Sequence, residues 1–409
     1  MVAVGCAGSD PATSPTPGTP GAPRTSLPRE LTTAERGVLG ASNAFSFGLW
    51  KTINAAQRDS NVFVSPLSAS FALGMTMNGA ATQTYDEMRS ALRFGDLASA
   101  DINAGYKSLI ALLTSLDATT TMEIANAIFY RTGFPFNQPF LGDASTYFDA
   151  QVTGQNFADA NGTLSAVNGW VNTKTHGKIP KILDQVNADD VMYLLNAIYF
   201  KGSWREKFDP AATHDAPFHP ATGADQTAPL MHRSASMAYT ETNSYQAVDL
   251  PYGDSSFTMT VLLPKAGNTV ESVAASLTPE TWQTLSGSFH SALVDLYLPK
   301  VTMSWKRGLI DDMKAQGMRA AFNAGGADFT RMSSRGNDLY ISKLQQNTFV
   351  AIDEVGTEAA AVTIGGVTVT SLPQTMNVRV DRPFVFVIRE RLSGTVLFMG
   401  KITRMPSAP

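Results

Sequence analysis

The chain has 409 residues, a net charge of -4 at pH 7, and 44% hydrophobic against 16% charged residues, which provides ample material for the core of a globular protein. It contains no block of Lys or Arg, which argues against nucleic acid or another polyanion as a main partner. No apolar run reaches the ~18 residues needed to span a bilayer, so we expect no membrane-spanning helix.

The first thirty residues are dominated by Pro, Thr, Ser, Gly and Ala, unlike everything after them. This composition predicts a flexible tether over residues 1–30, followed by one continuous domain over residues 31–409. Cys6 is the only cysteine, so no disulfide can form within the chain. It follows Ala3-Val4-Gly5, which is similar to the end of a bacterial lipoprotein signal, although the charged and apolar parts of such a signal do not precede it. We favour lipid attachment, or at least export, over an incidental cysteine, and expect membrane contact only through this lipid.

Helices and strands alternate along the remaining chain. Apolar residues between Phe45 and Ile53 recur at near-helical spacing and predict an opening amphipathic helix. Ser65 and Pro66 suit the N-cap and first position of a second helix, and residues 308–317 predict a third. Four runs rich in β-branched and aromatic residues predict strands at residues 257–264, 292–299, 348–353 and 384–388. The mixture predicts an α+β fold, with helices on an antiparallel or mixed sheet.

The sequence contains no residue pattern typical of a catalytic site. Its five histidines include no His-Glu-x-x-His pair, and a single cysteine excludes a cysteine-rich zinc site. There is no Gly-x-Gly for dinucleotide binding, and the nearest approach to a nucleophile elbow, at residues 40–44, lacks its second glycine. We therefore expect no enzyme activity, metal or cofactor.

Residues 353–373, DEVGTEAAAVTIGGVTVTSLP, form a long run with no charge after Glu358. Strand periodicity gives this run one face of small side chains only, from Thr357 to Val369. Such a face would allow the segment to slide between two strands already in place. On residue pattern alone, a permanent strand or an exposed loop rich in threonine explains the run equally well.

This segment resembles the hinge and reactive loop of the serpins. The family's hinge pattern, Glu-x-Gly-Thr-Glu-Ala-Ala-Ala-x-Thr, is matched by Glu354, Gly356, Thr357, Glu358, Ala359, Ala360, Ala361 and Thr363. Blocks that begin at Asn61, Asn196 and Val380 follow in the family's order, so the resemblance covers roughly residues 31 to 405. It implies a serpin fold of bacterial type, with three β-sheets, surrounding helices and an exposed reactive loop.

The resemblance implies a suicide-substrate inhibitor of serine proteases. In this family a protease cuts the reactive loop and remains attached as an acyl-enzyme. The freed loop then inserts into the central sheet, carrying the protease along before water can release it. We accordingly expect an extracellular or cell-surface monomer that forms a covalent complex with a serine protease.

Counting fourteen residues beyond Gly356, the spacing usual in the family, places the reactive bond at Thr370-Ser371. The bonds one and two residues earlier remain candidates. A small β-branched residue before the bond favours elastase-like or subtilisin-like targets, because a trypsin-like protease requires Arg or Lys there.

The resemblance also implies a group of residues that controls opening of the sheet: Ser65, Ser68, Asn196, Trp204 and Gln346. Where the family usually has a histidine, this chain has Gln346, which keeps the hydrogen-bonding capacity but removes any titration there. Core packing and polar satisfaction alone are an equally good explanation of this group.

Two rival functions remain at this point. The first is a non-inhibitory protein of the same fold, serving in binding, storage or a chaperone-like role. Its signature would be a bulky or charged inward residue in the hinge, and none is present. The second is an unrecognised hydrolase, which would turn over a substrate without any covalent complex.

Overall fold

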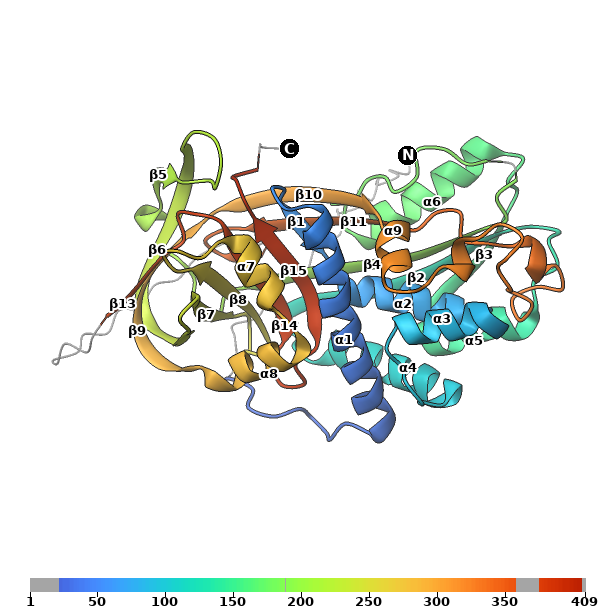
Figure 1. Ribbon diagram of the computed structural model, residues 1–409, viewed down its shortest axis with the longest axis horizontal. Helices are drawn as coiled ribbons and strands as arrows, with labels where there is room; N and C mark the ends of the chain where they lie inside the picture. Colours follow the sequence, from blue (N-terminus) through green and yellow to red (C-terminus); the bar gives the residue numbers. More distant parts are fainter. Residues whose placement is uncertain (1–21, 188, 358–374, 407–409) are drawn as a thin grey trace, which may run out of the picture.

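The computed structural model describes residues 22–187, 189–357 and 375–406. Helices α2 to α5 gather at one end of the molecule, and α1 runs past β14 and β15 toward them (Figure 1). The α-helices in the described ranges are α1 (Thr33–Ala56), α2 (Pro66–Met77), α3 (Thr82–Ala91), α4 (Ser99–Ser115), α5 (Gln138–Phe148), α6 (Ala160–Lys174), α7 (Val270–Ser276), α8 (Pro279–Ser288) and α9 (Ile310–Ala315).

Local signals explain where these helices begin. Helix α1 starts earlier than expected, because Thr32 and Glu35 form a capping box: Glu35 N donates to Thr32 Oγ1 at 3.1 Å and Thr32 N to Glu35 Oε2 at 2.6 Å. The expected second helix is confirmed as α2, with Ser65 as N-cap and Pro66 at its first position. The third is confirmed as α9, which is shorter than expected because Gly308 still belongs to a strand.

The larger sheet contains nine strands in the described residues. Its strands, in spatial order, are β1 (Val62–Val64), β15 (Val396–Ile402), β14 (Phe384–Glu390), β8 (Phe257–Pro264), β7 (Tyr245–Pro251), β6 (Gln226–Glu241), β9 (His290–Pro299) and β13 (Met376–Arg379). Strand β5 (His214–Phe218) pairs with the first part of β6, whereas only the last residues of β6 pair with β7. Strand β6 therefore joins two parts of this sheet.

The second sheet contains six strands in the described residues. They are β10 (Val301–Gly308), β11 (Gln345–Ile352), β12 (Gly356–Thr357), β4 (Met192–Ser203), β2 (Thr120–Arg131) and β3 (Ala150–Gln155). Counted with the two parts joined by β6, it gives the three sheets that the resemblance implied, and the α+β class is confirmed. The four predicted strands correspond to β8, β9, β11 and β14.

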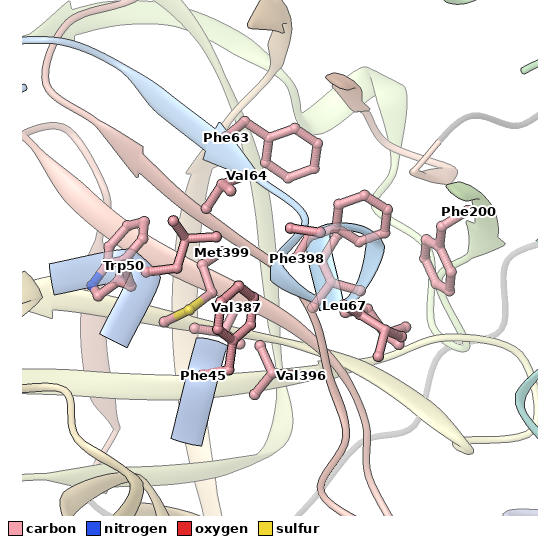
Figure 2. Packing of buried hydrophobic residues seen from close by; sticks show 14 of the residues in the cluster. Phe45, Trp50, Phe63, Val64, Leu67, Phe200, Val387, Val396, Phe398 and Met399 are labelled. Carbon is pink, nitrogen blue, oxygen red and sulfur yellow. The ribbon is translucent and has the colours of Figure 1, made fainter. Parts of the chain in front are cut away.

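The main hydrophobic core lies between the two sheets and the helices. Figure 2 shows part of it, where Phe45 and Trp50 of α1 pack near Val387 and Met399. A second cluster lies on the outer face of the six-stranded sheet, where α6 covers β2 and β4 through Trp170, a residue that is only 8% exposed. The six-stranded sheet is thus covered on both faces around β4.

The segment before α1 is attached to the domain at two points. Arg24 N donates to Asp254 O at 2.7 Å, and Arg24 Nε forms an ion pair with Asp254 Oδ2 at 3.0 Å. Arg29 pairs with Glu35, and this hydrogen-bonded pair lowers the pKa of Glu35 to about 2 although burial opposes it. The division between tether and domain at residue 30 stays a prediction. No helix within the described ranges is long and apolar enough to cross a membrane.

Candidate functional site

The short strand β12 lies between β11 and β4. Thr357 is paired with Ile352 of β11 on one side and with Gly202 of β4 on the other, both in antiparallel register. Beyond Thr357, the described residues provide no further strand between β11 and β4. We call this interval, bounded by residues 345–351 of β11 and 192–201 of β4, the slot.

Two cavities continue the line of β12 along the slot. The smaller, about 30 Å³, lies next to Thr357 and is lined by the apolar rings of Phe63, Phe200 and Phe398. Figure 2 shows these three rings at the edge of the core. The larger, about 450 Å³, lies further along and is lined by residues from α2, β4 and β11. The slot is therefore underpacked where an additional strand would lie.

Glycine is required at the point where the chain enters the slot. A Cβ on Gly356 would lie 2.1 Å from the carbonyl oxygen of Gly202 and 2.7 Å from the Cα of Ser203, so no other residue fits without moving β4. The next side chain, Thr357, is 5% exposed, and its hydroxyl lies 2.7 Å from the Tyr252 hydroxyl. The inward direction of Thr357 defines which face of the following residues points to the core.

A tight turn positions the hinge. Asp353 Oδ1 accepts hydrogen bonds from Val355 N at 2.9 Å and Gly356 N at 3.1 Å. Trp204 fixes the turn to β4, because its Nε1 donates to Asp353 O at 2.8 Å and its backbone N to Val355 O at 2.7 Å. The Trp204 indole stacks on Tyr252 with centroids 4.5 Å apart. The turn is thus held by both backbone and aromatic contacts.

Glu354 attaches the turn to the neighbouring sheet. Its carboxylate accepts from Lys300 Nζ at 2.7 Å and from Thr213 Oγ1 at 2.9 Å. The pKa of Glu354 is lowered: burial, the largest influence, opposes ionisation, but Lys300, backbone hydrogen bonding and Thr213 together outweigh it. The charged form of Glu354 therefore stabilises the hinge.

We predict that acid weakens this attachment. A lowered pKa contributes stability above the ordinary pKa of a glutamate, about 4.3, and this contribution is lost as the pH falls through the lowered value. The midpoint of unfolding should thus fall more in the parent protein than in Glu354→Gln between about pH 5 and pH 3. Parallel curves for the two proteins would contradict this assignment.

Trp204 lies at the hinge, whereas the other four residues expected to control opening form two groups on either side of the larger cavity. On the β11 side, Gln346 Nε2 donates to Ser65 O and Ser65 N donates to Gln346 Oε1, both at 2.8 Å. Ser68 N donates to Ser65 Oγ at 3.4 Å, the N-cap hydrogen bond of α2. On the β4 side, Asn196 Nδ2 donates to Asn126 Oδ1 at 2.7 Å. Within the described ranges no hydrogen bond joins the two groups, although Ser68, Asn196 and Gln346 all line the cavity.

Asn196 has an unsatisfied oxygen. Asn126 Nδ2 donates to Phe148 O at 2.6 Å, which fixes the orientation of that amide and turns the Asn196 amide nitrogen toward it. Asn196 Oδ1 is buried and has no partner in the described part of the chain. Because Asn196 lines the larger cavity, this oxygen is placed to accept a hydrogen bond from a polar group that enters the slot.

Comparison with known proteins decides the family. A family model described as Serpin (serine protease inhibitor) matches residues 40–405. The chain belongs to the serpin family. The leukocyte elastase inhibitor of Equus caballus is 31% identical to this serpin over 374 residues, which cover 89% of this chain and 98% of the relative. Neuroserpin of Rattus norvegicus is 28% identical over 372 residues, which cover 88% of this chain and 89% of the relative.

Solved structures agree with this assignment. The serpin is similar to tengpin, a thermophilic serpin in the native state, with a TM-score of 0.82, 29% identity and coverage of 94% of this chain and 97% of that one. It is also similar to a complex of thyroxine-binding globulin with thyroxine, with a TM-score of 0.81, 26% identity and coverage of 90% and 99%. The serpin fold is therefore confirmed.

Several residues assigned from the sequence lie outside the described residues of this serpin. They are Cys6, the hinge residues Glu358, Ala359, Ala360, Ala361 and Thr363, and the reactive bond Thr370-Ser371. The described hinge residues, Glu354, Gly356 and Thr357, lie together with Trp204 at one end of the slot. Sequence reasoning missed Lys300 and Tyr252, the partners of Glu354 and Thr357, and it missed Asn126, the partner of Asn196; no local pattern marks them.

A surface segment crosses the outer face of the slot. We call residues 175–187, which follow α6, the strap. His176 of the strap packs against Tyr199 of β4, with centroids 4.4 Å apart and the two rings tilted by 40°. On the other side, Asn347 Nδ2 of β11 donates to Lys181 O at 3.1 Å, and Lys178 Nζ lies 5.2 Å from the ring centroid of a β11 phenylalanine. A strand that enters the slot must therefore loosen the strap.

We predict that Asn347→Ala speeds this loosening. The variant removes one hydrogen bond between strap and β11, so insertion should become about two- to fivefold faster. Gln151→Ala, which removes one exposed side-chain contact on β3, serves as the control. The measurement is the limiting rate of protease inactivation at saturating serpin. A rate for Asn347→Ala equal to that of the control would show that the strap does not restrain insertion.

Proposed function

We propose that this serpin is a suicide-substrate inhibitor of serine proteases whose cleaved reactive loop inserts as a strand between β11 and β4. The observation that carries the proposal is the pairing of Thr357 with Gly202 and Ile352. Continued along the loop, this antiparallel register sets each next residue opposite the preceding residue of β4 and of β11.

The register assigns one face of the loop to the interior. Directly opposite side chains share a face of the sheet, and even-numbered residues of β4, such as Ile198 and Phe200, contact the main core. Alternate loop residues would lie opposite these side chains: Ala359 opposite Phe200, Ala361 opposite Ile198, and Thr363 opposite Asn196. The inward residues are all small, so they can enter the slot without displacing the core side chains that line it.

The same register brings a loop hydroxyl next to polar residues of the slot. Thr363 would lie opposite Asn196 on β4 and Gln346 on β11. Its hydroxyl would donate to Asn196 Oδ1, which has no protein donor among the described residues. Insertion would thus satisfy a buried acceptor as well as fill a cavity.

The length of β4 sets how far insertion can proceed. From Gly202 back to Met192 there are ten steps (202 − 192 = 10), which correspond to loop residues 358–367. At ~3.3 Å per residue, the inserted strand would extend roughly 33 Å from the hinge. A protease esterified near the end of the loop would be carried across the molecule before its acyl-enzyme is hydrolysed. The intact fold would be kinetically trapped above this more stable state.

The reactive bond is proposed at Thr370-Ser371, with the bonds one and two residues earlier as candidates. A threonine before the bond suits a shallow specificity pocket, as in elastase-like and some subtilisin-like proteases. The relative from Equus caballus is named as a leukocyte elastase inhibitor, which supports the first class. We propose that the serpin acts as a monomer outside the cell or at its surface, and that a lipid on Cys6 is its membrane attachment.

A non-inhibitory role is the second candidate. The observation in its favour is the likeness to thyroxine-binding globulin, a serpin-fold protein seen in complex with thyroxine. A binding protein of this kind has no need of a hinge that can insert. The small inward residues that follow Thr357 therefore favour inhibition.

Incubation with pancreatic elastase, neutrophil elastase and subtilisin tests the proposal. We expect a band of combined mass that survives boiling in detergent, and a released C-terminal fragment that begins at Ser371 by mass spectrometry. Cleavage of the loop by all three proteases without this band would favour the non-inhibitory role.

A further inference from the structure

The exposed face of β6, β9 and β13 carries two rows of side chains in direct register. Arg379, Tyr297 and His232 form one row across the three strands. Asn377, Asp295 and Ser234 form the next. We call these six residues the exposed ladder. Their strand neighbours Val294, Leu296 and Val378 are buried on the opposite face.

Contacts within the exposed ladder hold its side chains in place. The Arg379 guanidinium lies 4.8 Å from the centroid of Tyr297, and Tyr297 stacks on His232 at 4.4 Å with an interplanar angle of 18°. His232 Nε2 donates to Asp295 Oδ1 at 2.6 Å. Arg379 Nε donates to Asp381 Oδ2 at 3.0 Å. A partner would therefore meet side chains that are already ordered, which reduces the entropy cost of binding.

The exposed ladder lies close to the reactive bond along the chain. Four residues lie between Ser371 and Met376, the first residue of β13, so the two Cα atoms are five steps and at most ~18 Å apart even when the chain is fully extended. A protease domain of about 200 residues has a radius of gyration of about 16 Å. The active site of a protease bound at this bond therefore lies within that distance of the start of β13, so the protease body is large enough to reach the strands beside it.

We propose that the exposed ladder is a docking surface for the protease that attacks the reactive bond; the proposal rests on the inhibitory function above. Tyrosine and arginine are the residues that most often dominate binding at protein interfaces. The two Nη groups of Arg379 have no hydrogen-bond partner among the described residues, so they are available to a carboxylate or main-chain carbonyl of the protease. The Tyr297 ring offers a flat apolar surface beside them.

Equilibrium binding of an inactive protease tests this surface. The ligand is whichever of pancreatic elastase, neutrophil elastase or subtilisin cleaves the loop fastest, with its serine nucleophile replaced by alanine. We expect Arg379→Ala and Tyr297→Ala each to raise the Kd about fivefold or more. Arg58→Ala, an exposed arginine in the turn after α1, should leave the Kd unchanged. Arg379→Gln, which keeps the packing of the stem, should weaken binding as much as Arg379→Ala.

A structural defect would give a different result from a lost docking contact. Arg379→Gln should keep the parent melting temperature, and all three variants should keep the same number of serpin molecules consumed per protease trapped, because insertion does not involve the ladder. An unchanged Kd in Arg379→Ala, Arg379→Gln and Tyr297→Ala would overturn the proposal, and so would a failure of the parent serpin to bind the inactive protease. A ladder-dependent Kd without any covalent complex would uphold the docking surface and reject the inhibitory function. A covalent complex together with a Kd that is unchanged in the ladder variants would uphold the inhibitory function and reject the docking surface.

Discussion

Ala359→Asp should convert this serpin from an inhibitor into a substrate, whereas Ala360→Asp should leave trapping intact. The register that begins at Thr357 sets Ala359 opposite Phe200, beside the apolar cavity lined by Phe63 and Phe398. A carboxylate there would be buried without a partner, at a cost of several kcal/mol. Insertion would slow, and hydrolysis of the acyl-enzyme would overtake it.

The neighbouring residue provides the matched control. Ala360 would face outward, opposite Tyr199, where His176 of the strap lies on the same ring. Once the strap has loosened, an aspartate at that position meets an imidazole and solvent, so its cost is smaller than that of the inward aspartate. The measurements are the yield of detergent-resistant complex and the number of serpin molecules consumed per protease. Equal yields for Ala359→Asp and Ala360→Asp would show that the inward face is assigned wrongly.

Cleavage of the reactive loop should raise the melting temperature by about 10 °C or more. The inserted strand would form ladders with both β11 and β4, and it would fill the cavity of about 450 Å³ between them. Differential scanning calorimetry of intact and nicked serpin measures this change. The nicked Ala359→Asp variant should show a smaller rise, because its loop enters only part of the slot. Superimposable melting curves for intact and nicked parent serpin would rule out stored energy in the intact fold.

The inward face of the hinge could be predicted from the sequence because it depends on local periodicity. Small residues alternate from Thr357 onward, and the structure places Thr357 itself inward, at 5% exposure. The start of α2 was predictable for the same reason, since Ser65 and Pro66 are adjacent cap and first-turn signals. The capping box of Thr32 and Glu35 was equally local and could have shown that α1 begins at Thr33.

The contacts that hold the hinge could not be predicted in this way. Tyr252 is 105 residues from Thr357 in the chain, and Asn126 is 70 residues from Asn196. Such partners are brought together by sheet topology, which a single sequence does not rank among many alternatives. Lys300 likewise carries no pattern that marks it as the partner of Glu354. The reactive bond, the lipid on Cys6 and the outer hinge residues remain predictions.

Disulfide trapping tests the central claim, insertion between β11 and β4 in the register of Thr357. In a Cys6→Ser background, Ala361→Cys and Ile198→Cys would be opposite each other after insertion, with Cα atoms about 4.5 to 5.5 Å apart, within reach of a disulfide. Ala360→Cys with Ile198→Cys places the thiols on opposite faces and is the control. We predict that the first pair cross-links under mild oxidation only after the loop is cut, and that the control pair never does. No cross-link in the cleaved first pair, or equal cross-linking in the control, would contradict insertion in this register.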